Sequence, residues 1–278
     1  MVTGVSDNSA PAAEPLVLVE ADGPVLTVTL NRPEKRNATN AEVLCRLYDA
    51  WVRLDEDDDL RVAILTGKGS VFCAGMDLGE IARLNQGAKD NEWITRLVES
   101  PDISLKAYLK TYRPTKPIIL AAEGVARAGG TEILQGTDIR VAGESTVFGV
   151  TEVQRGLFPM AGSAVRLRRQ MGYAVAAEML LAGDDITAPR AHELGLINHV
   201  VPDGQALAKA RQIAERIAAN GPVAVRNILA VLRQTETMPE EEAFEIEMPL
   251  GYATMATEDA KEGPRAFLEK RAPVFQGR

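Results

Sequence analysis

The chain has 278 residues, of which 46% are hydrophobic, so it can bury a large core in one or two domains. Its net charge of −8 weighs against nucleic acid as the main partner. The 2 cysteines form no disulfide framework and the 2 histidines no metal cluster, so we expect a cytoplasmic location and no metal. No basic residue precedes Arg32 and no apolar run approaches the roughly 20 residues that span a bilayer, so we expect no leader peptide and no membrane partner.

Short β-rich runs follow a polar start. Residues 1–14 are small and rich in proline and alanine, which predicts a disordered N-terminal tail. The runs at 16–20 and 25–30 are separated by turn residues and predict a hairpin. Residues 62–66 form a mainly apolar run of the kind found in buried strands.

Helical signals lie on either side of that strand. Thr39 and Glu42 have capping-box spacing, so a helix is expected to begin there and to end near Leu54. Residues 79–113 show no single period and are expected to form broken helices. Such stretches often form the variable wall of a binding site.

The most informative stretch lies between residues 116 and 163. An apolar run at 118–122 predicts a buried strand, and a glycine pair, Gly129-Gly130, precedes a helical patch. A glycine turn before a helix leaves backbone N–H groups free to bind an oxygen that becomes negative during a reaction. Glu132 and Glu152 are carboxylates that could transfer a proton next to that oxygen. Alone, Glu132 also fits a helix N-terminal charge and Glu152 an ordinary loop acid.

The character of the chain changes near residue 203. Strands and helices alternate before it, which predicts an α/β core over residues 15–203. Long amphipathic helices predicted at 205–219, 222–234, 239–256 and 257–270 indicate a helical domain over residues 204–278. The pattern alone leaves open whether the core is a spiral of ββα units or a doubly wound sheet.

Five segments in this order resemble the crotonase superfamily, the enoyl-CoA hydratases and isomerases. Each motif alone is weak, but five in the correct order, spread over residues 16–278, identify the chain as a member. The segments are LNRP at 30–33, FCAGMDL at 72–78, the run from Lys116-Pro117 to Asp138, the run from Phe148-Gly149 to Ser163, and 263–271.

The resemblance implies a crotonase-like spiral with a helical C-terminal trimerisation domain, assembled as a homotrimer or homohexamer. It implies an acyl-CoA thioester substrate and no cofactor, because coenzyme A is part of the substrate. By the same resemblance, the backbone N–H groups of Met76 and Gly129 form an oxyanion hole, and Glu132 and Glu152 are the catalytic acid and base. The further residues that it implies for substrate or CoA binding are Arg32, Ala74, Asp77, Leu78, Met160, Phe267 and Lys270.

Two carboxylates favour a hydratase, which adds water to a 2-enoyl-CoA to give a 3-hydroxyacyl-CoA. Water addition needs one group to take a proton and another to deliver one, whereas a double-bond isomerase can work with a single carboxylate, here Glu152. A third alternative is a weakly active crotonase-like protein that only binds CoA thioesters.

The sequence departs from the family pattern at three positions. Ala128 stands where a third glycine is common, and Thr131 replaces a smaller residue. Met160 stands where glycine often helps to hold the catalytic water, and its side chain is expected to narrow the site or displace that water.

Overall fold

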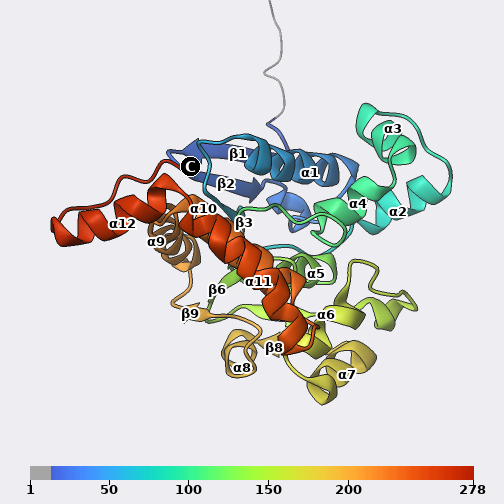
Figure 1. Ribbon diagram of the computed structural model, residues 1–278. Coiled ribbons are helices and arrows are strands. Elements are labelled where there is room, and N and C mark those ends of the chain that lie inside the picture. The colour runs from blue at the N-terminus through green and yellow to red at the C-terminus, as the bar shows by residue number, and fades with distance from the viewer. Residues whose placement is uncertain (1–13) are drawn as a thin grey trace, which may run out of the picture.

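A six-stranded sheet runs through the molecule (Figure 1). The computed structural model describes residues 14–278, so the predicted tail, apart from Glu14, lies outside the described residues. The strand order is β1-β2-β3-β4-β6-β9; β1 and β2 form the predicted antiparallel hairpin, and each later pair is parallel. The strands are β1 (Val17–Asp22), β2 (Val25–Leu30), β3 (Val62–Gly67), β4 (Ile118–Ala122), β6 (Ile139–Gly143) and β9 (His199–Val201).

Helices cover both faces of this sheet, which is why its middle strands are nearly continuous apolar runs. On one face, α1 (Ala41–Glu56) packs Leu47 and Trp51 into the larger core cluster. On the other, α9 (Ala206–Ala218) packs Ala210 and Ile213 against β3, β4 and β6. By packing, α9 therefore belongs with the core, although the sequence analysis expected it in the helical domain that begins at residue 204.

The helix α1 is capped one residue later than predicted. The Asn40 side chain, not Thr39, accepts a hydrogen bond from the Val43 N–H, at 3.0 Å. Glu42 accepts from the backbone N–H of Leu16 at 3.3 Å instead of closing a capping box. The predicted helix is correct, but the predicted capping box is wrong, because the Thr39 hydroxyl has another partner, described below.

A three-stranded sheet in the order β5-β7-β8 forms the second layer of strands. Its members are β5 (Val125–Arg127), β7 (Val147–Gly149) and β8 (Ile186–Thr187). The chain passes from β4 through β5 to α5 (Gly129–Leu134), and then from β6 through β7 to the 3-10 turn η2 (Glu152–Arg155) and α6 (Ser163–Gln170). These successive ββα turns, with β4 paired to β6 and β5 to β7, confirm the spiral over the doubly wound alternative.

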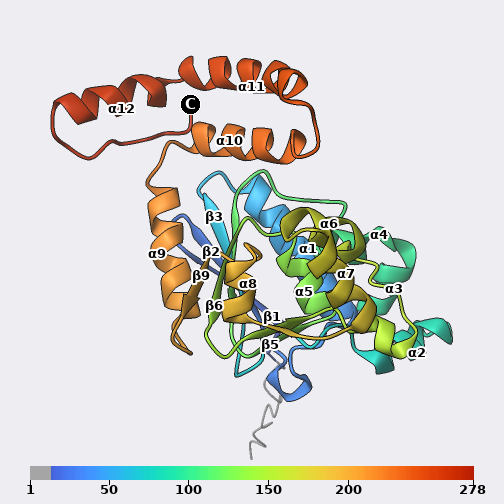
Figure 2. The same ribbon diagram turned by 90° about the horizontal axis from the view of Figure 1, so that it is seen from below.

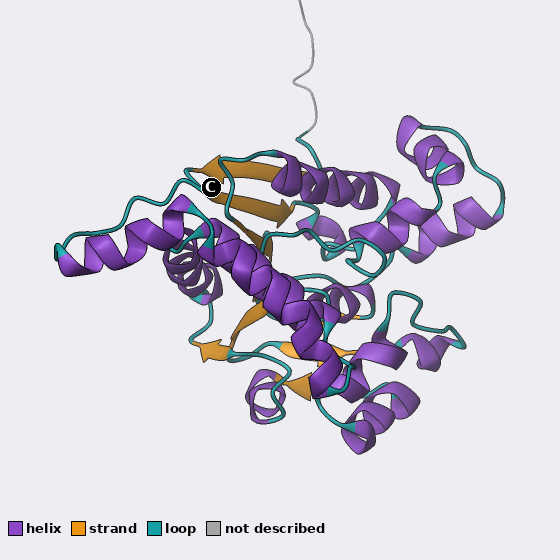
Figure 3. Ribbon diagram, in the orientation of Figure 1, coloured by secondary structure: helices purple, strands orange, loops and turns teal. Residues whose placement is uncertain are grey.

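Short helices surround the spiral (Figure 3). Between β3 and β4 the chain forms α2, α3 and α4, which confirms the broken helices expected over residues 79–113. The helices α3 and α4 pack on α1, so this excursion is anchored to the core. The bounds are α2 (Leu78–Asn85), α3 (Glu92–Glu99), α4 (Asp102–Ala107), α7 (Tyr173–Ala182) and α8 (Ala188–Glu193).

The last three helices lie away from the sheets (Figure 2). They are α10 (Pro222–Gln234), α11 (Glu240–Met255) and α12 (Glu258–Leu268). The chain end returns to them, where the Glu258 N–H donates to the Arg278 carbonyl at 2.8 Å. No side chain of α11 is buried. These helices carry an exposed C-terminal apolar face, comprising Ile228, Leu232, Phe244, Met248, Tyr252, Met255, Phe267 and Leu268.

Candidate active site

Two turns from different parts of the chain meet beside β5. Cys73 forms a parallel bridge with Ala126, with backbone hydrogen bonds to β5 of 3.0 and 2.9 Å. This pairing brings the turn at Gly75 against the turn at Gly129, because a Cβ added to Gly75 would lie only 3.4 Å from the Gly129 nitrogen. Gly75 also has a φ of +98°, which few other residues adopt. Glycine is therefore required at Gly75 by both conformation and space.

In the first turn, the backbone N–H of Met76 has no hydrogen-bond acceptor among the described residues. Met76 lies in a parallel bridge with Thr39, in which the Thr39 N–H donates to the Gly75 carbonyl at 2.9 Å and the Asp77 N–H donates to the Thr39 carbonyl at 2.8 Å. The C=O and N–H of one trans peptide group point in opposite directions, so the Met76 N–H, which shares its peptide with the Gly75 carbonyl, points away from Thr39. It has no acceptor among residues 14–278. The N–H of Met76 is thus free within the described residues, and its expected role as an oxyanion donor stays a prediction.

The second turn presents the Gly129 N–H at the start of α5. The preceding Ala128 is fixed by its own N–H, which donates to the Gly149 carbonyl at 2.8 Å, and by its carbonyl, which accepts from Thr131 and Glu132. The Gly129 N–H likewise has no acceptor within the described part of the chain. Two N–H groups without acceptors thus belong to two touching turns, and their use as an oxyanion hole stays a prediction.

Thr131, one of the departures noted above, ties these elements together. Its buried hydroxyl donates to the Ala126 carbonyl at 2.7 Å and accepts from the Gly149 N–H at 3.1 Å. It therefore links β5 to the end of β7, the strand that leads to Glu152. A smaller apolar residue would leave both backbone groups without this partner.

Ala128 has a φ of +50° and a ψ of −122°, a conformation that only glycine adopts readily. We expect Ala128→Gly to raise the free energy of unfolding by about 1 kcal/mol, because relief of this strain exceeds the added chain entropy of glycine. Urea denaturation of the two proteins measures the difference. A loss of stability would contradict the strain at this turn.

Glu132 lies on α5, with its side chain buried at 4% exposure. Its Oε1 accepts a hydrogen bond from the Ser163 N–H at 3.3 Å. Burial raises the pKa of this carboxyl above its ordinary value, and the backbone N–H groups of Ser163, Ala161 and Gly162 limit the rise. The turn that begins α6 therefore favours the ionised form of Glu132.

Glu152 stands at the start of η2, without such support. Its Oε2 is buried and has no hydrogen-bond partner among the described residues. Burial raises the pKa of Glu152 to about 7, its own backbone N–H and Arg155 limit the rise, and the nearby Glu132 carboxylate adds to it. Near neutral pH, the pair thus favours one ionised carboxylate and one protonated carboxyl, with Glu152 the better holder of the proton.

Arg32 and Asp77 bind each other. The Arg32 guanidinium donates to Asp77 at 2.8 Å and to the Ala38 carbonyl at 3.0 Å. Asp77 caps α2 by accepting from Gly79 at 2.9 Å. Burial opposes the ionised form, but Arg32 and the cap hold the pKa of Asp77 below its usual range. Both residues thus support the Met76 turn, and their expected contact with CoA stays a prediction.

Ala74 and Leu78 flank the same turn. The Ala74 N–H donates to the Arg36 carbonyl at 3.0 Å, so its peptide is part of the scaffold. Leu78 is the first residue of α2, and its side chain is exposed. Their proposed substrate contacts also stay predictions.

Met160 does not point into the protein. Its side chain is 62% exposed, and its carbonyl accepts a hydrogen bond from the Lys110 Nζ at 2.6 Å. Phe158, two residues earlier, is also exposed. The Met160 side chain is therefore mostly open to solvent in this chain, and its expected effect on the site stays a prediction.

Phe267 and Lys270 lie elsewhere. Phe267 is 82% exposed near the end of α12, and Lys270 follows in a turn with a φ of +53°. Figures 1 and 2 both show α12 on the opposite side of the molecule from α2, which begins directly after the Met76 turn. One protomer alone does not bring them to its own site.

Tyr108 and Thr39 lie beside the two turns, a placement that the sequence did not predict, although Tyr108 belongs to the stretch 79–113 that was expected to form a binding-site wall. The Tyr108 ring is buried, and its Oη lies 2.5 Å from the Thr39 Oγ1. Burial raises the pKa of Tyr108 above its ordinary value, and the nearby Cys73, Glu132 and Glu152 add to the rise. A lone tyrosine in a helical excursion gives no sequence signal for this placement.

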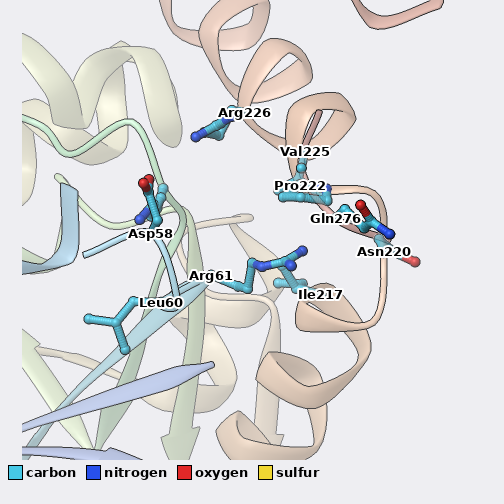
Figure 4. Close-up of a pocket in the computed structure, with 11 residues that line it drawn as sticks. Asp58, Leu60, Arg61, Ile217, Asn220, Pro222, Val225, Arg226 and Gln276 are labelled. Carbon is cyan, nitrogen blue, oxygen red and sulfur yellow. The ribbon is translucent and has the colours of Figure 1, made fainter. Parts of the chain in front are cut away.

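A cavity of about 190 Å³ lies apart from this site, at the N-terminal ends of β3 and β4 (Figure 4). Arg61, Lys116 and Arg226 line it, and none of the predicted site residues does. In residues 14–278 no group of histidine, cysteine or acidic side chains could hold a metal ion. None of the helices described is long and apolar enough to cross a membrane.

The fold defines a ββα-spiral protein in which two touching turns each carry a backbone N–H without an acceptor among the described residues. The family model of enoyl-CoA hydratase/isomerase matches residues 20–278, and the chain belongs to this family. The chain is 54% identical to the enoyl-CoA hydratase EchA19 of Mycobacterium tuberculosis, over 95% of its own length and 97% of that protein. It is 36% identical to the 2,3-dehydroadipyl-CoA hydratase of Escherichia coli, over 94% and 99% of the two chains. The solved structure of a putative enoyl-CoA hydratase/isomerase from Mycobacterium abscessus is 44% identical, covers 95% of this chain and 100% of its own, and superposes with a TM-score of 0.85.

Proposed function

We propose that this protein is an enoyl-CoA hydratase that reversibly adds water to a 2-enoyl-CoA and gives a 3-hydroxyacyl-CoA. The coupled pair of Glu132 and Glu152 beside two free backbone donors carries this proposal. Two differently perturbed carboxyls suit a reaction that removes one proton and delivers another. The names of the relatives at 54% and 36% identity support the same reaction.

In the proposed reaction the thioester oxygen accepts hydrogen bonds from the N–H groups of Met76 and Gly129. Negative charge grows on this oxygen as water attacks C3, so the donors stabilise the enolate more than the neutral carbonyl. Ionised Glu132 takes a proton from the attacking water. Protonated Glu152 delivers a proton to C2. The reaction needs no cofactor beyond the coenzyme A of the substrate.

The test is to follow the conjugated thioester absorbance of short, medium and long 2-enoyl-CoA substrates. A hydratase removes the absorbance and forms the 3-hydroxyacyl-CoA. Measurable binding of all of them without loss of absorbance would contradict the proposal. A 3-enoyl-CoA that gains conjugation without water addition would support the isomerase alternative, with Glu152 as the proton carrier.

The proposed protonation states predict the pH dependence. Hydration needs Glu152 protonated, so kcat/KM is expected to fall as pH rises through about 7. It needs Glu132 ionised, so activity is expected to fall at acid pH as well, with a midpoint above the ordinary glutamate value. A kcat/KM profile from pH 5 to 9 measures both limbs, which belong to the coupled pair. A profile flat through pH 7 to 9 would argue against Glu152 as the acid.

We also propose that the protein assembles as a homotrimer or homohexamer through the C-terminal apolar face. Large apolar side chains exposed on successive helices, as on α10–α12, are typical of an association site. Assembly could also bring Phe267 and Lys270 to the CoA end of a neighbouring site. Light scattering after size-exclusion chromatography measures the state, and a monomer at micromolar concentration would contradict it. The free, buried Cys45 and Cys73 fit the reducing cytoplasm that we propose as its location.

A further inference from the structure

Tyr108 lies in contact with the second oxyanion turn. A Cβ added to Gly129 would lie 2.6 Å from the Tyr108 Oη and 2.9 Å from its Cε1 and Cζ. The edge of the phenol ring therefore packs directly on the Gly129 Cα. Tyr108 immediately follows α4, which is anchored to α1, so the ring is held by a rigid part of the core.

Thr39 holds the first oxyanion turn in place through its backbone. Its backbone holds Gly75 and Asp77 through hydrogen bonds of 2.9 and 2.8 Å, one on each side of Met76. These two bonds fix the peptide plane that carries the Met76 N–H. Thr39 directly precedes Asn40, the N-cap of α1, so its own position is also fixed by the core.

One hydrogen bond joins these two supports. The Thr39 Oγ1 and the Tyr108 Oη are 2.5 Å apart, both residues are buried, and either can donate. The Thr39 hydroxyl also lies 3.5 Å from the Gly75 carbonyl. A continuous chain of contacts thus runs from Met76 through Thr39 and Tyr108 to Gly129, separate from the direct contact of the two turns.

We infer that Thr39 and Tyr108 are positioning residues that set the spacing and aim of the two oxyanion donors. This inference rests on the proposed function of Met76 and Gly129. A buried tyrosine that merely satisfies its hydroxyl would support stability alone. A positioning pair also acts on the transition state, because the donors stabilise charge only if they are aimed at the enolate oxygen.

The test uses Thr39→Val and Tyr108→Phe, which remove each hydroxyl with little change of shape. Each variant is expected to lower kcat about 10-fold and to change KM less than about 2-fold, because one net hydrogen bond is lost from the support. The double variant is expected to equal either single one, since both remove the same bond. Thr39→Ser keeps the hydroxyl and is expected to restore kcat.

A spectroscopic readout separates aim from stability. A conjugated cinnamoyl-CoA probe absorbs at longer wavelength when its thioester oxygen is polarised by hydrogen bonds. The wild-type protein is expected to red-shift the bound probe, and both variants are expected to reduce this shift at saturation. Tyr112→Phe is the matched control, because it also removes a tyrosine hydroxyl. That hydroxyl donates to Asp55 at 2.6 Å, and the Tyr112 ring packs edge-on against Tyr48. This variant is expected to leave the shift and kcat unchanged.

The outcomes separate the positioning role of Tyr108 from the oxyanion hole itself. A red shift in the wild type that persists undiminished in Tyr108→Phe, with unchanged kcat, would overturn the positioning role and leave the oxyanion hole intact. A wild-type protein that binds the probe without any red shift would overturn the oxyanion hole and the positioning pair with it. If Thr39→Val lowers stability, Tyr108→Phe carries the test alone.

Discussion

Replacing Glu152 with glutamine is expected to lower kcat for enoyl-CoA hydration by about 10²- to 10⁴-fold, the usual contribution of a positioned acid or base. Glutamine has the same size but cannot deliver the proton that C2 needs. Glu132→Gln is expected to fall in the same range, because the attacking water then loses its base. Steady-state kinetics on the best 2-enoyl-CoA measures both variants.

The control for these variants is Glu144→Gln, an exposed carboxyl in the turn between β6 and β7. It is expected to keep full activity. At pH 8, Glu152→Gln is expected to unfold at no lower temperature than the wild type. The raised pKa of Glu152 means that ionised Glu152 destabilises the folded state at any pH above the ordinary glutamate pKa, and glutamine carries no charge. Near-full activity in Glu152→Gln or Glu132→Gln would show that its assignment is wrong.

Gly129→Ala is expected to lower kcat by about 10²- to 10³-fold, comparable to the loss of one oxyanion donor. The added methyl would lie 2.6 Å from the Tyr108 Oη, so either the ring or the turn must move. If the turn moves, the Gly129 N–H no longer points at the thioester oxygen. A backbone N–H cannot be removed by a side-chain substitution, so this variant tests it indirectly. Stopped-flow or steady-state hydration kinetics measures the effect.

The matched glycine control for that variant is Gly221→Ala, at the N-cap of α10, where the nearest atom to an added Cβ is 3.9 Å away. It is expected to keep kcat. Gly129→Ala with kcat within a factor of about 2 of the wild type would contradict the tight contact with Tyr108 and the role of this turn.

Much of the fold was predictable because its signals are local. The apolar run at 118–122 became β4 without change, because a strand buried on both faces needs an uninterrupted apolar sequence. The N-cap was missed because Thr39 and Asn40 are both good capping residues, and only the tertiary partner of Thr39 decides between them. The amphipathic pattern of α9 predicted a helix but could not say which surface its alanines cover.

The candidate site was predictable only through motif order. Glu132 and Glu152 are 20 positions apart on different elements, and no periodicity indicates that they couple. The resemblance supplied this pairing, and in the structure the Glu132 carboxylate is near enough to add to the raised pKa of Glu152. The sequence placed Tyr108 in an expected binding-site wall at 79–113, but its contacts with Gly129 and Thr39 could not be predicted, because those residues are far from it in sequence.

The most direct test of the central claim is to incubate the protein with its best 2-enoyl-CoA in D₂O and analyse the product by mass spectrometry and NMR. The proposed chemistry predicts a 3-hydroxyacyl-CoA with one carbon-bound deuterium, at C2, because Glu152 exchanges its proton with solvent before delivering it. It also predicts that this product is absent with Glu152→Gln on the same timescale. Thioesters that bind but return without a 3-hydroxyl group, or with deuterium only at C4, would contradict hydration by this pair of glutamates.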